Sequence, residues 1–251
     1  MAIEDYSASI LCVLKTKVQS EEAAYELPYE IMCDSSPSNE IRILSWTLGV
    51  RKGELLGIAI EGVNLKTATI TISQQVLDLD DGPSIEPYTK NGKARTLPLT
   101  PRLVALLRIR LEQLLAERGR DDWEEYGLLF PSERGTPMSE RNLDRHFKEA
   151  CLKAAIRLRD TGKRTKKDTP IYKSELKFHH LRHTCLSWLG DTGASDMVIK
   201  AIAGHADEDV TDRYVHVSLS AMHEAIERME RVKILRNDDE QPGAERRAEA
   251  G

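Results

Sequence analysis

The sequence predicts a mainly α-helical domain with a small three-stranded antiparallel β-sheet, an α+β fold class. Residues 67–76 alternate in polarity and are rich in β-branched side chains, a pattern typical of a strand. Residues 85–90 and 94–99 predict two further strands on either side of Asn91-Gly92, a pair that suits a tight hairpin turn. Elsewhere apolar residues recur at helical spacing, as in Leu103, Leu107, Leu111 and Leu114.

The predicted helices follow one another along most of the chain. The first begins at Asn39 and ends at Gly49, and the next begins at Arg51. Thr100-Pro101 predicts an N-cap followed by proline at the first helical position, in a helix that ends at Gly119. Further helices are expected over 139–156, near His179, Ser195 and Asp209, and over 218–235, whereas 157–176 predicts a long loop or a hairpin.

Length and composition are those of an ordinary soluble protein. The 251 residues fit one domain of roughly 200 residues with extra segments, or two small domains. We expect a short N-terminal segment over 1–26, the domain over 27–235 and a disordered tail over 236–251. No apolar stretch has the length of a membrane span, and the acidic start does not resemble a signal peptide. These features predict a cytoplasmic protein without a membrane partner.

The charge is unevenly distributed along the chain. The net charge is −5, but residues 157–182 carry nine basic and three acidic residues. A local basic stretch of this kind favours contact with a phosphate backbone. The cysteines form no C-x-x-C pair, so we expect buried free thiols rather than a zinc or redox site at Cys12, Cys33, Cys151 and Cys185.

Several common active-site motifs are absent from the sequence. It contains no G-x-x-x-x-G-K-[ST] loop, no G-x-G-x-x-G fingerprint and no H-E-x-x-H helix. It also lacks the G-x-S-x-G turn that carries a nucleophilic serine. The sequence therefore gives no support for ATP, dinucleotide, metalloprotease or serine-hydrolase chemistry.

Three clusters of reactive residues remain, and each of them taken alone is weak evidence of a function. Arg51 could form a surface ion pair with Glu54 at a helix start. His179 and His183 would share a helix face and could bind a metal, but no third ligand is near in sequence. A single tyrosine such as Tyr214 is an ordinary core or surface residue.

The three clusters together, in their order and spacing, resemble the tyrosine recombinases, which include phage integrases and Xer-type resolvases. Residues 48–55 are similar to the family's T-G-L-R-x-S-E-L box, and residues 179–183 match H-x-L-R-H. Gly204-His205 followed by Tyr214 nine residues later matches the third box. The Lys90 hairpin and Leu129-Phe130-Pro131 also fit. The resemblance covers residues 27–235 and implies the tyrosine recombinase catalytic-domain fold.

None of the substitutions that depart from the family pattern falls at a catalytic position of the family. Leu48 stands where threonine is usual, Ala203 where leucine is usual, and His180 where aspartate is common. The family usually places a helical core-binding domain before the catalytic domain, and only 26 residues precede the match. We therefore expect either an excised catalytic domain or a protein that lacks this clamp.

The resemblance implies a specific role for each matched residue. Tyr214 would attack the phosphorus atom, His179 would act as its base, and Lys90 would protonate the leaving 5′-oxygen. Arg51 and Arg182 would bind the phosphate through planar, charged forks. His205 would donate a further hydrogen bond to the phosphate, and Glu54 would orient an arginine. The reaction would form a 3′-phosphotyrosyl bond and need no cofactor, metal or ATP.

Two assignments stay open at the level of sequence. Lys93 lies in the same hairpin as Lys90 and could be the general acid instead, although Lys90 precedes Asn91-Gly92 as in the family hairpins. The basic stretch either contacts DNA or forms a solvated loop, and contact is the interpretation we favour. The predicted DNA-binding residues are Lys163, Arg164, Lys166 and Lys167.

The partners follow from the same resemblance. They are double-stranded DNA, further copies of the chain in a homo-tetramer on DNA, and possible accessory DNA-bending proteins. Helix 218–235 would dock on a neighbouring protomer, with packing on its own domain as the alternative. The predicted function is site-specific recombination for integration or excision of a mobile element. The alternatives are strand relaxation like that of a type IB topoisomerase, a catalytically degenerate DNA-binding protein, and a metal-binding protein.

Overall fold

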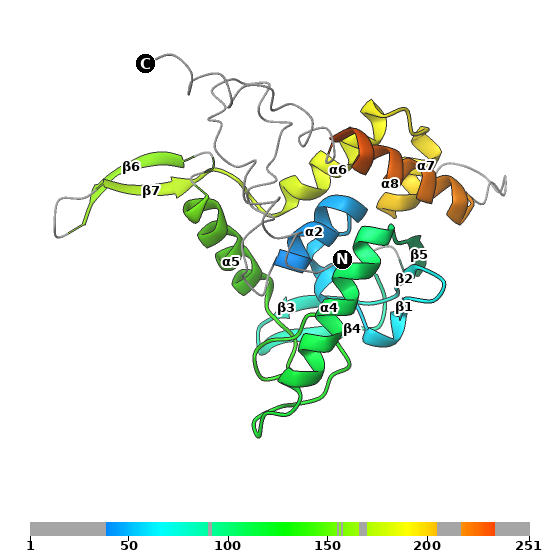
Figure 1. The fold of residues 1–251 in the computed structure, drawn as a ribbon. Coiled ribbons are helices and arrows are strands. Elements are labelled where there is room, and N and C mark those ends of the chain that lie inside the picture. Colours follow the sequence, from blue (N-terminus) through cyan, green and yellow to red (C-terminus); the bar gives the residue numbers. More distant parts are fainter. Residues whose placement is uncertain are drawn as a thin grey trace, which may run out of the picture.

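The computed structural model describes residues 39–89, 92–154, 156, 158–165, 170–204 and 217–233, and helix α2 (Asn39–Leu48) is its central element (Figure 1). Nine of the ten residues of α2 are buried, because other elements pack around it. Helix α6 (His179–Asp191) packs directly against α2. Trp46 and Trp188 meet edge to face in this contact, with ring centroids 5.0 Å apart.

Side-chain caps start several of the remaining helices. Thr100 accepts a hydrogen bond from the backbone N–H of Leu103, which confirms the predicted N-cap. Ser139 and Ser195 cap the helices that follow them in the same way. The bounds are α3 (Lys52–Leu56), α4 (Pro101–Glu117), α5 (Glu140–Lys153), α7 (Asp196–Ala203), α8 (Leu219–Lys233) and the 3₁₀ turn η3 (Ile60–Gly62).

The strands form one small sheet and two separate ribbons. Strands β1 (Val63–Asn64), β2 (Thr69–Ile72) and β5 (Arg95–Pro98) make a three-stranded antiparallel sheet in the order β1-β2-β5. Strands β3 (Gln75–Leu79) and β4 (Gly82–Glu86) pair only with each other. A second ribbon joins β6 (Leu158–Arg164) and β7 (Pro170–Ser174). The predicted fold class, mainly α with a small antiparallel sheet, is confirmed.

The pairing of the strands differs from the prediction. The hairpin expected across Asn91-Gly92 would pair 85–90 with 94–99, but β4 pairs with β3 and β5 pairs with β2. The chain reverses instead at Asp80-Asp81, just before Gly82, which offers a competing Asp-Gly turn signal. The Gly92 N–H donates to the Thr89 carbonyl over 2.8 Å, whereas Lys90 and Asn91 lie outside the described residues.

The segment 157–176, expected as a loop or a hairpin, contains the β6–β7 hairpin, which projects away from the helical body (Figure 1). Its exposed strands place its basic side chains in solvent. The four residues 166–169, between the two strands, lie outside the described residues.

Helix α8 packs against its own domain. Its apolar face contacts β5, α6 and α7, and its buried apolar residues belong to the hydrophobic core that the described helices share. This arrangement is the alternative to docking on a neighbouring protomer. The buried apolar side chains of α8 are Met222, Ala225, Ile226 and Met229.

Other predictions are tested only in part. Cys151 and Cys185 are buried free thiols, as expected, whereas Cys12 and Cys33 lie outside the described residues. The predicted N-terminal segment over 1–26, the helix near Asp209 and the tail over 236–251 also lie outside them. Among the described helices, none combines the length and the apolar character that a membrane crossing requires.

Candidate active site

Arg51 and Glu54 meet where the chain passes from α2 into α3. Gly49 ends α2 with a positive φ of 58°, a conformation that a side chain would strain. Arg51 then occupies the N-cap position of α3, and its backbone N–H donates to Glu54 Oε2 over 3.2 Å. Its guanidinium Nη1 donates to Glu54 Oε1 over 2.8 Å. The carboxylate therefore fixes both the backbone and the side chain of Arg51.

Helix α6 supplies His179 and Arg182, which are three residues apart and share one helix face. Arg182 Nη1 donates to the Gly49 carbonyl, at the turn before Arg51. Its Nη2 donates to the Ala203 carbonyl over 2.9 Å. Arg182 thus joins α6 to both the α2–α3 turn and the end of α7.

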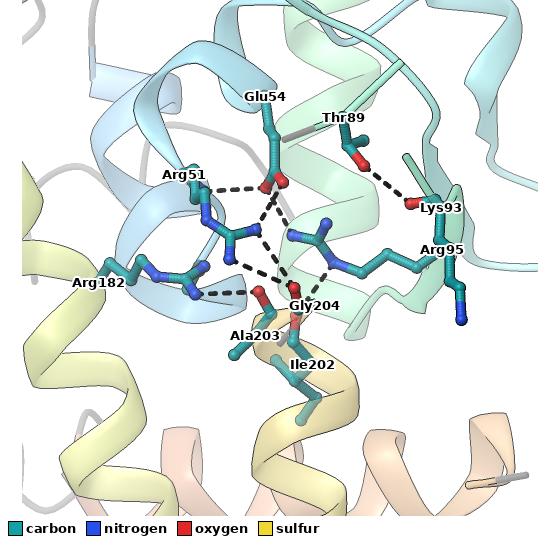
Figure 2. A network of polar contacts seen from close by, with 10 residues as sticks. Arg51, Glu54, Thr89, Lys93, Arg95, Arg182, Ile202, Ala203 and Gly204 are labelled. Carbon is teal, nitrogen blue, oxygen red and sulfur yellow. Dashed lines mark hydrogen bonds and ion pairs between the residues drawn. The ribbon is translucent and has the colours of Figure 1, made fainter. Parts of the chain in front are cut away.

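Three guanidinium groups converge on the C-terminal end of α7, and we call Arg51, Arg95 and Arg182 the arginine cluster (Figure 2). Arg51 donates to the Gly204 carbonyl from both Nη1 and Nη2 over 3.3 Å, and Arg95 Nε donates to the Ile202 carbonyl over 3.2 Å. The last carbonyls of a helix lack partners within the helix and carry its partial negative charge. The three arginines donate hydrogen bonds to these carbonyls and place positive charge beside them.

Glu54 supplies the negative charge at the centre of this arrangement. Its side chain is 0% exposed, and Arg95 Nη2 donates to Oε2 over 2.7 Å. Burial by itself would raise the pKa of Glu54, but the hydrogen bonds and charges of Arg95 and Arg51 outweigh burial and lower it. Glu54 is therefore ionised at neutral pH and holds both guanidinium groups.

Burial also changes the ionisation of the residues from α6. Desolvation, followed by the charge of Arg51, lowers the pKa of Arg182 to about 10, so Arg182 remains a cation at neutral pH. Partial desolvation, followed by electrostatic interactions with His183 and Lys177, lowers the pKa of His179. His179 is therefore neutral at pH 7, the form that a general base requires.

A basic cleft opens beside His179. It has a volume of about 630 Å³ and lies between α5, the β6–β7 hairpin and the start of α6. Asp144 and Glu175 are its acidic residues, and Lys52 at its edge forms ion pairs with Glu140 and Asp144 over 3.0 and 2.8 Å. The cleft is rich in cations, which are Lys52, Lys148, Arg159, Lys173 and Lys177.

The histidines of α6 lie close together, but they do not form a recognisable metal centre. The ring centroids of His179 and His183 are 5.2 Å apart. Within the described ranges, no group of three or more histidine, cysteine or acidic side chains is placed to hold a metal ion. His180 accepts a hydrogen bond at Nδ1 from the Lys177 N–H over 3.2 Å, which turns that ring toward the helix start.

The lysine hairpin is described only in part. Lys90 lies outside the described residues, whereas Lys93 is exposed and its carbonyl accepts a hydrogen bond from Thr89 Oγ1 over 2.9 Å. The choice between Lys90 and Lys93 as general acid therefore stays a prediction. His205 and Tyr214 also lie outside the described residues.

The predicted DNA-binding residues belong to the projecting hairpin. Lys163 and Arg164 are exposed at the end of β6, in the hairpin that projects away from the helical body (Figure 1). Lys166 and Lys167 lie between the two strands, outside the described residues. The structure therefore places the described pair on a solvent-exposed ribbon and leaves their contact with DNA a prediction.

Sequence reasoning did not identify Arg95. Its side chain is only 12% exposed and lies on β5, where it contacts Glu54 and the end of α7. A signal was present in the alternation of the strand, because Arg95 and the fully buried Leu97 occupy positions of the same face. An arginine on a buried strand face requires a carboxylate or carbonyl partner.

The sequence matches the phage integrase family over residues 30–220. It is 27% identical over 189 residues to the integrase of Staphylococcus phage L54a, covering 73% of this chain and 49% of that protein. It is 25% identical over 183 residues to the tyrosine recombinase XerD of Pseudomonas aeruginosa, covering 71% of this chain and 49% of XerD. The chain thus spans about half the length of these curated relatives.

Solved structures show a similar fold. The Tn1549 transposon integrase, solved in complex with transposon right end DNA, superposes with a TM-score of 0.55 at 17% identity, over 91% of this chain and 65% of that one. The XerA recombinase superposes with a TM-score of 0.52 at 24% identity, over 83% and 63%. The family match covers the arginine cluster and all three predicted boxes, and the chain belongs to the phage integrase family.

Proposed function

We propose that this chain is the catalytic part of a site-specific DNA recombinase that cleaves and rejoins DNA through a 3′-phosphotyrosyl intermediate. The observation that carries the proposal is the meeting of Arg51 and Arg182, 131 positions apart in sequence, at the end of α7. Gly204 ends that helix, and the next residue in sequence is His205. Family membership supports the same chemistry.

The proposed reaction conserves the energy of the phosphodiester bond. The Tyr214 oxygen attacks phosphorus and forms the phosphotyrosyl bond, while His179 accepts the phenolic proton. The bond to the 5′-oxygen breaks, and Lys90 protonates that oxygen as it leaves. A free 5′-hydroxyl from a partner duplex then gives its proton to Lys90 and attacks the phosphotyrosyl phosphorus. The bond to the Tyr214 oxygen breaks, and that oxygen takes its proton back from His179.

The arginines would stabilise the charge that develops on the phosphate. A pentavalent phosphorus carries extra negative charge on its oxygens, and Arg51 and Arg182 present charged N–H donors that are already oriented by Glu54 and by backbone carbonyls. Pre-oriented donors cost little reorganisation during the reaction. His205 would add a further hydrogen bond to the same oxygens.

The basic cleft and the β6–β7 hairpin are the proposed contacts with the DNA backbone. The cleft adjoins His179 and contains five cationic side chains, enough to bind phosphates next to the reacting one. The hairpin extends the same basic surface away from the body of the domain (Figure 1). Double-stranded DNA is therefore the proposed partner, and integration or excision of a mobile element the proposed outcome.

Assembly into a homo-tetramer on DNA belongs to the same proposal, with DNA-bending proteins as accessory partners. The apolar face of α8 is already buried against its own domain. Contacts between protomers would therefore use the exposed side of α8 or the segments that flank it.

Covalent trapping on DNA tests the proposal directly. The protein is incubated in EDTA with a library of nicked duplexes, and SDS-resistant protein–DNA adducts are collected and sequenced. We expect an adduct with the wild-type chain and none with Tyr214→Phe, because phenylalanine lacks the attacking oxygen. Tyr126→Phe, which changes an exposed tyrosine that belongs neither to the arginine cluster nor to the lining of the basic cleft, should form the adduct at the wild-type rate.

Three outcomes would contradict the proposal. An adduct that persists in Tyr214→Phe would assign the nucleophile to another residue. The absence of any adduct, despite intact duplex binding, would point to a catalytically degenerate DNA-binding protein. Adducts at many unrelated sequences, with relaxation of supercoiled plasmid and no strand exchange, would indicate a topoisomerase instead.

A further inference from the structure

We propose that Arg95 is a positioning residue of the active site, which holds Glu54 and the C-terminal end of α7 in the arrangement that the phosphate-binding arginines require. The inference rests on the proposed function, because it assigns to Arg95 a role in the same cleavage step. Arg95 lies on β5 and belongs to none of the three predicted boxes.

Arg95 connects parts of the site that are distant in sequence. Its Nη2 donates to Glu54 Oε2 on α3 over 2.7 Å, and its Nε donates to the Ile202 carbonyl on α7 over 3.2 Å (Figure 2). Its guanidinium also lies directly against Gly204, where a Cβ atom would come within 2.7 Å of Nη1. The side chain thus fills the space between α3 and the end of α7.

The shape of the guanidinium explains why arginine occupies this position. A planar fork can donate to a carboxylate from one edge and to a carbonyl from Nε at the same time. A lysine has one nitrogen at the end of a flexible chain, so it can retain the positive charge but not both directed contacts. Charge alone is therefore insufficient, and the geometry of the fork is part of the role.

Glu54 transmits the effect of Arg95 to Arg51. The two arginines divide the carboxylate between them, Arg95 at Oε2 and Arg51 Nη1 at Oε1. Without Arg95, the carboxylate loses its shortest hydrogen bond and can rotate within its buried pocket. Arg51 would then lose the orientation in which it faces Gly204 and the phosphate. We therefore expect slower chemistry with little change in DNA affinity.

Loss of Arg95 also changes the ionisation of Glu54. The charged groups that face Glu54 are Arg51, Arg95 and Arg182. Burial raises the pKa of Glu54 and the arginines lower it, so removal of Arg95 moves the pKa upward. Glu54 would then become protonated at a higher pH than in the wild type. Lys52 of α3 instead pairs with Glu140 and Asp144 of α5.

Arg110 provides a matched control for the experiment. It is also a buried arginine that binds one carboxylate, Glu117, through Nη1 and Nη2 over 2.7 and 2.9 Å. Its Nε donates to the Leu129 carbonyl over 3.1 Å, as Arg95 Nε does to Ile202. Arg110 lies on α4 and takes no part in the candidate site. Arg110→Gln therefore removes a comparable set of buried contacts without changing the candidate site.

The test compares Arg95→Gln, Arg95→Lys and Arg110→Gln with the wild type in single-turnover adduct formation, DNA binding and pH dependence. We expect Arg95→Gln to slow adduct formation about 100-fold while duplex affinity stays within about threefold. The acidic limb of its pH–rate profile should move to higher pH. Arg95→Lys should keep the acidic limb near its wild-type pH, because lysine keeps the positive charge. It should still slow adduct formation, because lysine cannot make both directed hydrogen bonds of the guanidinium. Arg110→Gln should match the wild type in all three measurements.

The outcomes separate the inference from the proposed function. Equal rates for Arg95→Gln and Arg110→Gln, with an active wild type, would overturn the inference alone. A loss of duplex affinity as large as the loss of rate would also overturn it, because Arg95 would then touch DNA. If Arg95→Gln does not fold, Arg95→Lys decides the matter by the same criteria. A wild-type chain that forms no adduct would overturn the proposed function and the inference with it.

Discussion

Glu54 shows how one buried carboxylate organises the candidate site. It accepts hydrogen bonds from the Arg51 backbone, from the Arg51 guanidinium and from Arg95. An unpaired buried charge is costly, so the ionised carboxylate and its two arginines stabilise one another only as a set. The geometry of the arginine cluster is therefore coupled to local folding at this residue.

Gly204 gives a prediction at the same scale. Its φ of +65° is left-handed, and a Cβ atom there would contact the Arg95 guanidinium at 2.7 Å. We expect Gly204→Ala to lower the free energy of unfolding by about 1–2 kcal/mol through backbone strain and also to slow adduct formation. Gly127→Ala is the control, since Gly127 has the same φ with open space around it. It should show the loss of stability in chemical denaturation without the loss of rate, and equal rates for the two variants would refute the contact.

Individual residues also show the limits of prediction from sequence. Arg51 and Glu54 could be paired because they are three positions apart at a helix start, and His179 and Arg182 because they share a helix face. Arg95 could not be paired with Glu54, because 41 positions separate them and only the tertiary fold brings them together. Local periodicity carries no information about such contacts.

Among the secondary-structure elements, the helices could be predicted better than the strand partners. Thr100, Ser139 and Ser195 each mark a helix start through a local side-chain cap. Strand pairing instead depends on which of several possible turns joins two strands. The hairpin forms at Asp81-Gly82, between β3 and β4, rather than at Asn91-Gly92. The choice of β2 as the partner of β5 buries Ile70 against Leu97, a gain that neither strand reveals alone.

The β6–β7 hairpin carries the prediction for DNA contact. We expect Lys163→Gln with Arg164→Gln to reduce the slope of log affinity against log salt by about one unit for each phosphate that the hairpin no longer neutralises. Adding Lys166→Gln and Lys167→Gln should reduce it further. Binding is measured by fluorescence anisotropy over a range of salt concentrations.

A matched pair of substitutions controls for net charge in this salt titration. Lys66→Gln with Arg108→Gln removes the same charge from exposed positions near β2 and on α4. This variant should keep the wild-type slope. If the hairpin variant keeps that slope as well, the hairpin does not contact phosphate and its basic residues form a solvated ribbon.

At the scale of the whole molecule, one hydrophobic core among the described residues joins the helices that carry the site. Trp188 of α6 packs on Trp46 of α2, so both sides of the arginine cluster depend on the same packing. We expect Trp188→Ala to lower the free energy of unfolding by about 3–5 kcal/mol in urea titrations followed by circular dichroism. Leu115→Ala, at a side chain that is 67% exposed, should change it by less than about 0.5 kcal/mol. Two separate transitions in the wild type would contradict a single core.

The arginine cluster has a consequence for a chain that is still being synthesised. Arg51, Glu54 and Arg95 emerge early, but the carbonyls that complete their arrangement belong to residues 202–204. In every nascent or truncated product that stops before α7, Arg51 and Arg95 therefore lack the backbone carbonyls that orient their guanidinium groups. For a protein proposed to cut DNA, this order of emergence delays competence until nearly the whole domain exists. Incomplete copies would then pose little danger to the chromosome of the cell that makes them.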